Sequence, residues 1–245
     1  MSNVPIITID GPSGTGKGTI CSYLADWLQW HLLDSGTLYR VLALAAEKKG
    51  IDSDDEIAIV ALAENLNVEF KVAGIGSLVN IELDRKAVTD EVRTEICASA
   101  ASVIASIAKV REVLLLKQRT FHKAPGLIAD GRDMGTVVFP NAALKVYLTA
   151  SPEERAKRRY EQLKKKGFNA NLRDLSAAIV ARDERDSTRS VSPLKPADGA
   201  IVIDTSSLGI DAVLENISEL VRTTFPELTE QVANHLCRVS SLKLT

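Results

Sequence analysis

A lysine stands within a run of glycines near the start of the chain, in the stretch IITIDGPSGTGKGTI. The apolar residues 4–9 predict a buried strand, and apolar side chains recur at helical spacing from Lys17 to about Trp30. A glycine-rich turn between a strand and a helix can direct backbone N–H groups at phosphate oxygens, and the helix dipole and a lysine add positive charge. The alternative is a glycine-rich turn that binds nothing. We predict a loop that binds the phosphates of a nucleoside triphosphate, formed by Gly11, Pro12, Ser13, Gly14, Thr15, Gly16, Lys17, Gly18 and Thr19.

The residue after this lysine argues for phosphoryl transfer. It is Gly18, whereas switch GTPases and many motor ATPases have a Ser or Thr there whose hydroxyl binds Mg²⁺ directly. The sequence also contains no Asn-Lys-x-Asp run with which a GTPase would read guanine. We therefore predict an enzyme that hands the phosphoryl group to an acceptor.

Three clusters of arginine follow in the chain, in LLDSGTLYR, ADGRDMG and ARDERDSTR. Arginine stays charged and binds phosphate with two N–H groups at once, which suits the binding of a phosphorylated acceptor. Taken singly, the second cluster could be an ordinary turn and the third an exposed, salt-bridged helix face. Together with the loop they predict an acceptor site, and their polar residues are Ser35, Arg40, Asp130, Arg132, Asp133, Arg182, Arg185, Asp186 and Arg189.

The bulk properties exclude several other classes of protein. The chain has 245 residues, a formal net charge of -2 and a sequence pI of about 6.0, so it lacks the basic excess of a nucleic-acid binder. Its three cysteines, Cys21, Cys97 and Cys237, are scattered and fit buried thiols in a reducing compartment better than a disulfide framework or a metal site. The N-terminal apolar run is too short to span a bilayer and lacks the layout of a signal peptide. We expect a cytoplasmic protein that binds no membrane, and a monomer, because no apolar stripe repeats at heptad spacing.

The elements that must position these residues alternate between short apolar runs and helical segments. GLIADG, LKVYLTA and AIVIDT read as further strands, each ending near a polar residue, as in a parallel sheet covered by helices. The alternation of apolar and polar residues around Ala73-Gly74-Ile75-Gly76 predicts a hairpin in a small inserted antiparallel sheet. The basic stretch SPEERAKRRYEQLKKKGF begins with a good helix-capping sequence, and residues from 226 onward could form one more amphipathic helix.

Taken in order, the loop, WHLLDSGTLYR, GLIADGRDMGTVVFP, ERAKRRYEQLKKKGF and RDERDSTR resemble bacterial-type cytidylate kinase over nearly the whole chain, to about residue 225. The resemblance implies an α/β fold of the P-loop NTPase type, with helices on both faces of a parallel sheet, an inserted antiparallel β-subdomain and a short helical lid. It implies a single kinase domain, residues 1–225, with a core of about 1–64, 90–150 and 190–225. The insert that binds the nucleoside monophosphate would be about 65–89, the lid about 151–170, and residues 226–245 would be a tail outside the resemblance.

The resemblance also implies the reaction: transfer of a phosphoryl group from ATP to CMP or dCMP, giving ADP and CDP or dCDP. Mg²⁺ would be held mainly through the nucleotide phosphates, without a protein metal site of its own. The base would be read by Ser102, Arg111 and Asp133, the ribose held by Arg182 and Asp186, and the acceptor phosphate by Arg40, Arg132 and Arg189 beside Ser35. The lid would bring Arg155, Arg158 and Arg159 to ATP, and the catalytic charges would be Lys17, Arg132, Arg158 and Arg189.

Two alternatives stay open at this stage. The acceptor could be another small molecule, such as UMP or a hydroxylated metabolite, in which case CMP would be no better than its competitors. The protein could instead be an NTP hydrolase or switch, which would turn over ATP without any acceptor. Gly18 and the lack of a guanine-reading run count against this second alternative.

Overall fold

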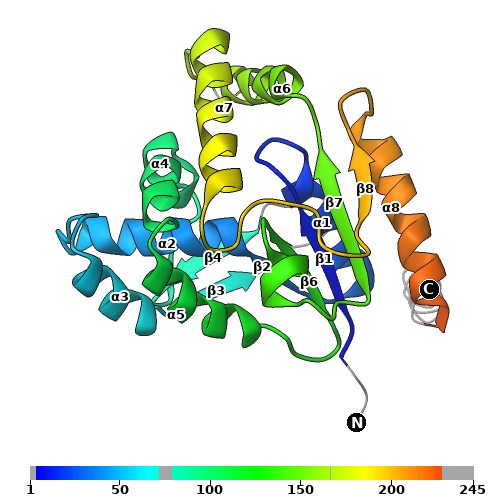
Figure 1. Cartoon of the computed structure of the whole chain (residues 1–245), viewed down its shortest axis with the longest axis horizontal. Helices are drawn as coiled ribbons and strands as arrows, with labels where there is room; N and C mark the ends of the chain where they lie inside the picture. Colours follow the sequence, from blue (N-terminus) through cyan, green and yellow to red (C-terminus); the bar gives the residue numbers. More distant parts are fainter. Residues whose placement is uncertain (1–3, 72–78, 166, 228–245) are drawn as a thin grey trace, which may run out of the picture.

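A five-stranded parallel sheet forms the centre of the computed structural model, which describes residues 4–71, 79–165 and 167–227 (Figure 1). Neighbouring strands pair in the order β2-β6-β1-β7-β8, and every pairing is parallel. All carboxyl ends therefore lie at one edge of the sheet, where ligands bind in open α/β folds. The strands are β1 (Ile6–Asp10), β2 (His31–Asp34), β6 (Leu127–Gly131), β7 (Leu144–Thr149) and β8 (Ile201–Asp204).

Helices cover both faces of this sheet. On one face α1 (Lys17–Leu28) and α8 (Ile210–Thr224) pack against it, and their core includes Ile7, Leu24 and Ile217, all fully buried. On the other face lie α5 (Ala108–Arg119) and a short wide turn of helix, η2 (Met134–Val138). The two central strands β1 and β6 are buried along their whole length, as expected for strands covered on both sides.

A second hydrophobic core lies beside the sheet, to the left in Figure 1, and it belongs to an annex of helices and short strands. Its fully buried members include Leu42, Ile59 and Leu66. A three-stranded antiparallel sheet packs onto it, as predicted, but the predicted turn at Ala73-Gly74-Ile75-Gly76 lies outside the described residues. The annex comprises α2 (Ser35–Lys48), α3 (Glu56–Glu64), β3 (Val68–Lys71), β4 (Asn80–Leu83), β5 (Lys86–Ala87), η1 (Glu91–Arg93) and α4 (Glu95–Ile104).

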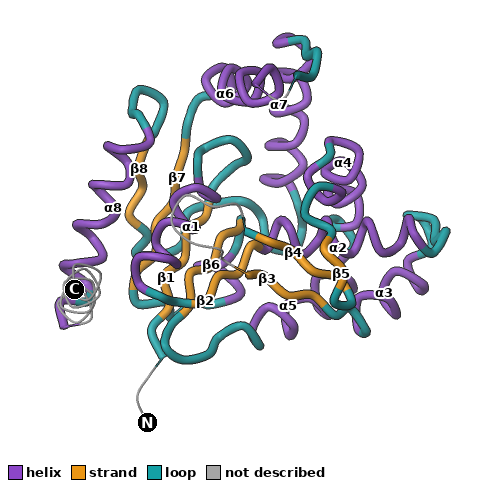
Figure 2. The backbone as a smooth tube through the Cα atoms, turned by 180° about the vertical axis from the view of Figure 1, so that it is seen from behind, coloured by secondary structure: helices purple, strands orange, loops and turns teal. Residues whose placement is uncertain are grey.

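Two helices stand over the carboxyl edge of the sheet, at the top of Figure 1 and again in the reversed view of Figure 2. They are α6 (Pro152–Lys165) and α7 (Leu172–Thr188), which pack against each other. The basic stretch expected to form a lid is therefore one arm of a two-helix hairpin. The predicted fold class, a P-loop-type α/β sheet with an antiparallel insert and a helical lid, is confirmed.

Two details differ from the sequence-based picture or lie beyond it. The third arginine cluster is not a single helix face, because α7 ends at Thr188 and Arg189 takes an extended ψ of 135°. The expected C-terminal helix falls almost entirely in residues 228–245, outside the described part. Within the described residues, no helix is both long and apolar enough to cross a membrane.

Candidate functional site

The glycine-rich loop joins β1 to α1 at the carboxyl edge of the sheet. Gly11, Gly14 and Gly16 have φ values of +141°, +85° and +93°, which side chains with a Cβ rarely adopt. At Gly11 an added Cβ would also lie 2.0 Å from the carbonyl oxygen of Leu148, so only glycine fits there. The loop has the backbone conformation that a phosphate-binding nest requires.

Lys17 begins α1 and turns back over this loop. Its ammonium group donates to the carbonyl oxygen of Pro12 at 2.7 Å and lies 3.5 Å from the hydroxyl of Thr15. Burial, together with the positive charge of Arg132, lowers the pKa of Lys17 to about 8. A phosphate group entering the loop would offset both effects and favour the charged lysine.

An open cleft of about 450 Å³ lies in front of the loop, between the annex and the α6–α7 hairpin. Nine of its lining side chains are Lys or Arg and three are Asp or Glu. Such an excess of positive charge suits the binding of two polyanionic ligands that face each other. The cations are Lys17, Arg40, Arg93, Arg132, Arg155, Arg158, Arg159, Arg182 and Arg185, and the acids are Asp34, Glu95 and Asp130.

Four of the nine predicted acceptor residues line this cleft directly: Arg40 from α2, Ser102 from α4, Arg132 from the end of β6, and Arg182 from α7. Arg40 donates to the carbonyl oxygen of Val92 at 3.1 Å. The buried Nε of Arg182 has no hydrogen-bond partner in the described part of the chain, and burial lowers the pKa of this side chain to about 9. A buried guanidinium donor without a partner points to a missing anionic or polar ligand.

The other five predicted acceptor residues, Ser35, Arg111, Asp133, Asp186 and Arg189, stand behind the cleft wall and bond to one another or to neighbours. Asp186 accepts from the Nε of Arg132 at 2.8 Å. Arg189 lies on the other side of Asp186, with 3.7 Å between Nη2 and Oδ1. The structure thus joins the second and third sequence clusters through one carboxylate, shared by Arg132 and Arg189.

Arg111 and Asp133 form a second buried ion pair, between α5 and the turn after β6. The side chains are 7% and 6% exposed, and the guanidinium of Arg111 lies 5.7 Å from the centre of the Tyr39 ring. Ser35 begins α2, and its hydroxyl accepts a hydrogen bond of 3.1 Å from the buried amide of Gln118 on α5. Residues far apart in the sequence are therefore locked in place by α5 before any ligand binds.

Three carboxylates lie near the loop, and the sequence analysis named only one of them, Asp130, as part of the acceptor site. Asp10 ends β1 and accepts from the backbone N–H groups of Met134 and Gly135 at 2.8 and 2.7 Å, which fixes the turn carrying Arg132 and Asp133. Burial raises the pKa of Asp10 to about 6 and that of Asp130 to about 7, although the nearby Lys17 opposes the second shift. Asp34 caps α2 through the N–H of Thr37 at 2.8 Å and lines the cleft with Asp130.

The comparisons with known proteins agree with this geometry. The family model described as cytidylate kinase matches residues 7–223. A cytidylate kinase from Shewanella denitrificans is 55% identical over 90% of this chain and 97% of its own length. One from Nitrosococcus oceani is 54% identical over 87% and 94%.

The chain belongs to the cytidylate kinase family. The resemblance stated from the sequence is confirmed, and with it the predicted activity, phosphorylation of CMP or dCMP by ATP. Among solved structures, a shikimate kinase from Bacteroides thetaiotaomicron is 12% identical with a TM-score of 0.44, covering 89% of this chain and 98% of its own. That similarity is too distant to add to the argument.

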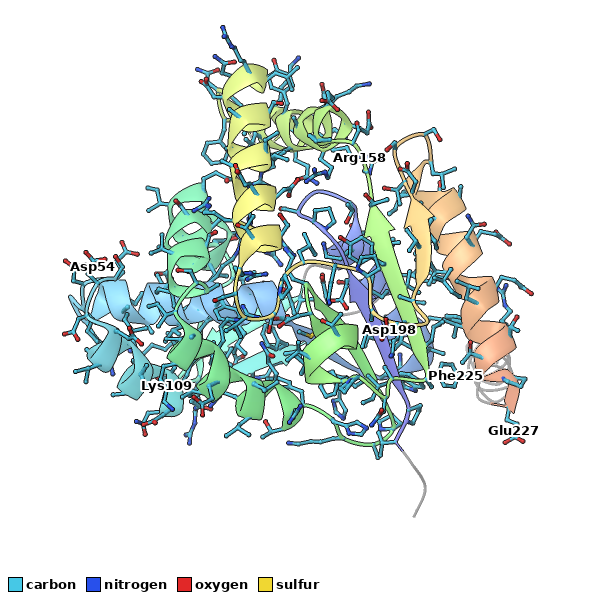
Figure 3. All side chains as sticks on the ribbon, in the orientation of Figure 1. Asp54, Lys109, Arg158, Asp198, Phe225 and Glu227 are labelled. Atoms are coloured by element: carbon cyan, nitrogen blue, oxygen red, sulfur yellow. The ribbon has the colours of Figure 1, made fainter. Side chains whose placement is uncertain are left out.

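In this cytidylate kinase the three predicted lid arginines differ in their placement. Arg158 donates to the hydroxyl of Thr205 at 3.1 Å and, as labelled in Figure 3, lies between α6 and the carboxyl ends of β7 and β8. Arg159 pairs with Glu95 on α4, across the cleft. Arg155, by contrast, is only 2% exposed and its guanidinium is bound by Asp183. Arg158 and Arg159 also bond within the protein, but their side chains are 26% and 31% exposed, against 3% for Arg155.

A sequence signal existed for most of what was missed. Asp10 and Asp34, like the predicted Asp130, stand at the carboxyl ends of strands, the position where acids near a ligand are expected. Arg93 and Glu95 also line the cleft, but they follow a segment of short strands whose path no sequence pattern fixed. Asp183 sits in the third arginine cluster, and nothing in its spacing indicates a partner 28 residues earlier.

Proposed function

We propose that the cleft holds ATP at its loop end and the nucleoside monophosphate between α2, α4 and α7, so that the two phosphate groups meet near Lys17 and Arg132. One observation carries this assignment: the loop and the predicted acceptor residues Arg40, Ser102, Arg132 and Arg182 line a single cleft. Phosphoryl transfer of this kind depends on positioning and on neutralising charge, and the protein offers nine cations for the task.

On the donor side, Lys17 and the backbone N–H groups of residues 11–19 would bind the β- and γ-phosphates. The ammonium group of Lys17 donates to a carbonyl oxygen of its own loop. It could donate to a phosphate bound in the loop instead with only a small movement of the side chain. Arg158 and Arg159 would close over the transferred group from α6 and exclude water, which would otherwise take the phosphoryl group.

On the acceptor side, Arg40, Arg132 and Arg189 would hold the monophosphate beside Ser35, and Arg182 with Asp186 the ribose hydroxyls. The unpartnered Nε of Arg182 supports such a role. Ser102, Arg111 and Asp133 would read the amine, ring nitrogen and carbonyl of cytosine. The buried Nε of Arg111 has no hydrogen-bond partner within the described residues, so a base that cannot accept from it would leave this donor unpaired and bind less well.

Asp34 and Asp130 fit a Mg²⁺ ion that is bound mostly by phosphate and water. Both carboxylates line the cleft beside the loop, and the Oδ2 of Asp130 lies 3.8 Å from where a Cβ on Gly18 would stand. No group of three or more His, Cys, Asp or Glu able to hold a metal occurs in the described residues, so the phosphates would supply the remaining ligands. The ion would shield charge on the transferring oxygens, as it does in phosphoryl transfer generally.

The remaining expectations concern the protein's surroundings. We propose that it acts as a monomer in the cytoplasm and binds neither nucleic acid nor membranes. Its net charge of -2 and three scattered cysteines support this proposal. Gel filtration with light scattering would test the oligomeric state.

The test is ADP release from ATP and Mg²⁺, first without an acceptor and then with CMP, dCMP, UMP, AMP or GMP. We expect ADP only when an acceptor is present, fastest with CMP or dCMP, and no reaction once EDTA removes Mg²⁺. Equal rates with all five acceptors would contradict the assignment of the base-reading residues. Equal ADP release in every tube would mean hydrolysis and would contradict the proposed transfer.

A further inference from the structure

Arg155 lies at the meeting point of the loop, the end of β7 and α7. Its Nε donates to the carbonyl oxygen of Ala150 at 2.9 Å, and one Nη donates to the carbonyl oxygen of Ser13 at 3.1 Å. The same Nη lies 3.1 Å from Oδ1 of Asp183, and the other Nη bonds to Oδ2. Four of its five N–H donors are thus used within the protein.

The stem of Arg155 also packs directly against the loop. A Cβ built on Gly14 would lie 3.0 Å from the Cβ of Arg155, so the arginine forms part of the wall that shapes the loop. A ligand for ATP phosphates would need free donors, and Arg155 keeps only one. The expectation that Arg155 binds ATP therefore has no support from this geometry.

Helix α7 is held at two points one turn apart. Asp183 forms an ion pair with Arg155, which in turn donates to the carbonyl oxygen of Ser13 in the ATP-binding loop. Asp186 fastens the helix to Arg132 at the end of β6, in the acceptor region. Arg182, with its unpartnered Nε, lies directly before Asp183. A shift of the loop carbonyl at Ser13 would therefore act on α7 through one bidentate ion pair, in which Arg155 is buried and Asp183 is partly exposed.

We propose that Arg155 and Asp183 are positioning residues that set α7, and with it the acceptor residues Arg182 and Asp186, relative to the ATP-binding loop. The inference rests on the proposed function, since it assumes that these two regions bind ATP and CMP. It has a thermodynamic consequence. If the position of α7 depends on the position of the loop through this pair, an ATP analogue must change the affinity for CMP. CMP must then change the affinity for the analogue by the same factor.

The experiment measures CMP binding by isothermal titration calorimetry, with and without a saturating non-hydrolysable ATP analogue and Mg²⁺. The variants are Asp183→Asn, which keeps the shape but removes the charge, and Arg155→Lys, which keeps the charge but cannot bind in bidentate fashion. Glu184→Gln is the matched control, because Glu184 is the exposed neighbour of Asp183 and loses the same charge. Thermal unfolding of each variant reports its stability separately.

We expect the analogue to change the CMP affinity of the wild-type enzyme at least about 5-fold, a typical coupling between two sites. In Asp183→Asn and Arg155→Lys this factor should fall to near 1, while CMP affinity without the analogue changes less than about 3-fold. Their double variant should be no worse than the more affected single variant, because both act through one contact. Glu184→Gln should retain the wild-type factor.

Three results would overturn the inference. The first is that the analogue does not change the CMP affinity of the wild-type enzyme. The second is that Asp183→Asn keeps the wild-type coupling factor, even if its melting temperature falls, because the pair would then have only a structural role. The third is a loss of analogue affinity about 10-fold or greater in Arg155→Lys alone, which would make Arg155 an ATP ligand. Failure of the proposed function would look different, because the wild-type enzyme would then bind neither CMP nor the analogue.

Discussion

The donor and acceptor regions of this cytidylate kinase are built in opposite ways. The donor region is a continuous loop of nine residues, 11–19, whose shape depends on backbone conformation and on three glycines with positive φ. The proposed acceptor region draws its residues from five parts of the fold: Ser35 and Arg40 from α2, Ser102 from α4, Arg111 from α5, Arg132 and Asp133 from the turn after β6, and Arg182, Asp186 and Arg189 from α7 and the residue that follows it. The first region is a motif, whereas the second exists only in the folded protein.

The two regions are also stabilised differently. Main-chain geometry holds the loop, so most of its side chains matter little to its shape. Buried ion pairs hold the acceptor region, and removing one partner of such a pair leaves an uncompensated buried charge. Damage to the donor region should therefore abolish chemistry with the fold intact, whereas damage to the acceptor region should weaken binding and stability together.

The largest effect is expected for Lys17→Met. The variant loses the positive charge nearest the loop, so kcat should fall about 10³-fold. The apolar methionine side chain suits the buried site. The KM for CMP and the melting temperature should change little, because no residue of the acceptor region bonds to Lys17 in the described structure. Steady-state kinetics with varied CMP at saturating ATP measures both constants.

Lys49→Met is the control for that variant, since Lys49 is exposed at the end of α2 and loses the same charge. A fall in kcat of less than about 10-fold for Lys17→Met would contradict the role given to this lysine. A large rise in the KM for CMP would show that the donor and acceptor regions are not separable at this residue.

Asp186→Asn should damage the acceptor region next most strongly. It removes the carboxylate shared by Arg132 and Arg189, leaving two buried guanidinium groups without it. We expect the kcat/KM for CMP to fall about 10²-fold and the free energy of unfolding to fall by about 3 kcal/mol. Kinetics with each substrate varied, and chemical unfolding, provide the measurements. Asp174→Asn, at an exposed position on the same helix, is the control and should change neither quantity. If Asp186→Asn raised the KM for ATP as much as the KM for CMP, the donor and acceptor regions would not be separate.

The same contrast explains how much the sequence could predict. The loop, its strand and its helix were predictable because each part is local: the glycines, Lys17 and the apolar runs lie within 30 residues of one another. The parallel sheet followed from strands that end near polar residues. The three arginine clusters indicated an acceptor site, but Ser102 and Arg111 could be assigned only through the resemblance, because no local feature separates them from an ordinary helix serine and a surface charge. Arg155 shows the limit, since whether it bonds to ATP or to Asp183 depends on a contact across the fold.

Base selection should respond to a change at Arg111, with a smaller effect. Arg111→Met removes one partner from the pair with Asp133 but keeps an apolar side chain against Tyr39. The preference for CMP over UMP, measured as the ratio of the two kcat/KM values, should fall about 10-fold, because the site no longer penalises the wrong base edge. The exposed Lys109→Met on the same helix serves as the control. An unchanged ratio would remove Arg111 from the base-reading set.

The smallest expected effect on activity concerns Asp130, a carboxylate that lies beside the donor loop and whose ionisation depends on pH. Its pKa is raised to about 7 by burial, whereas in the unfolded chain it would titrate near 3.8. The folded protein therefore binds this proton more tightly than the unfolded chain does. The stabilisation from the proton is complete below about pH 4 and is lost as the pH rises through about 7. The ligand-free wild-type enzyme should thus lose more stability between pH 4 and 7.5 than Asp130→Asn does, by up to about 4 kcal/mol.

Urea unfolding at steps of pH would measure the two profiles. Asp10, whose own pKa is raised to about 6, titrates in both proteins. Parallel profiles would mean that Asp130 is ionised at little cost in the free enzyme. Asp130→Asn should also need more Mg²⁺ for activity at pH 8, because the wild-type carboxylate is then charged and lies beside the phosphate loop. Both results together would show that the ionised Asp130 destabilises the ligand-free fold but favours binding of the nucleotide with Mg²⁺. The backbone fixes the shape of the donor loop, and this charge beside it would then be retained for function.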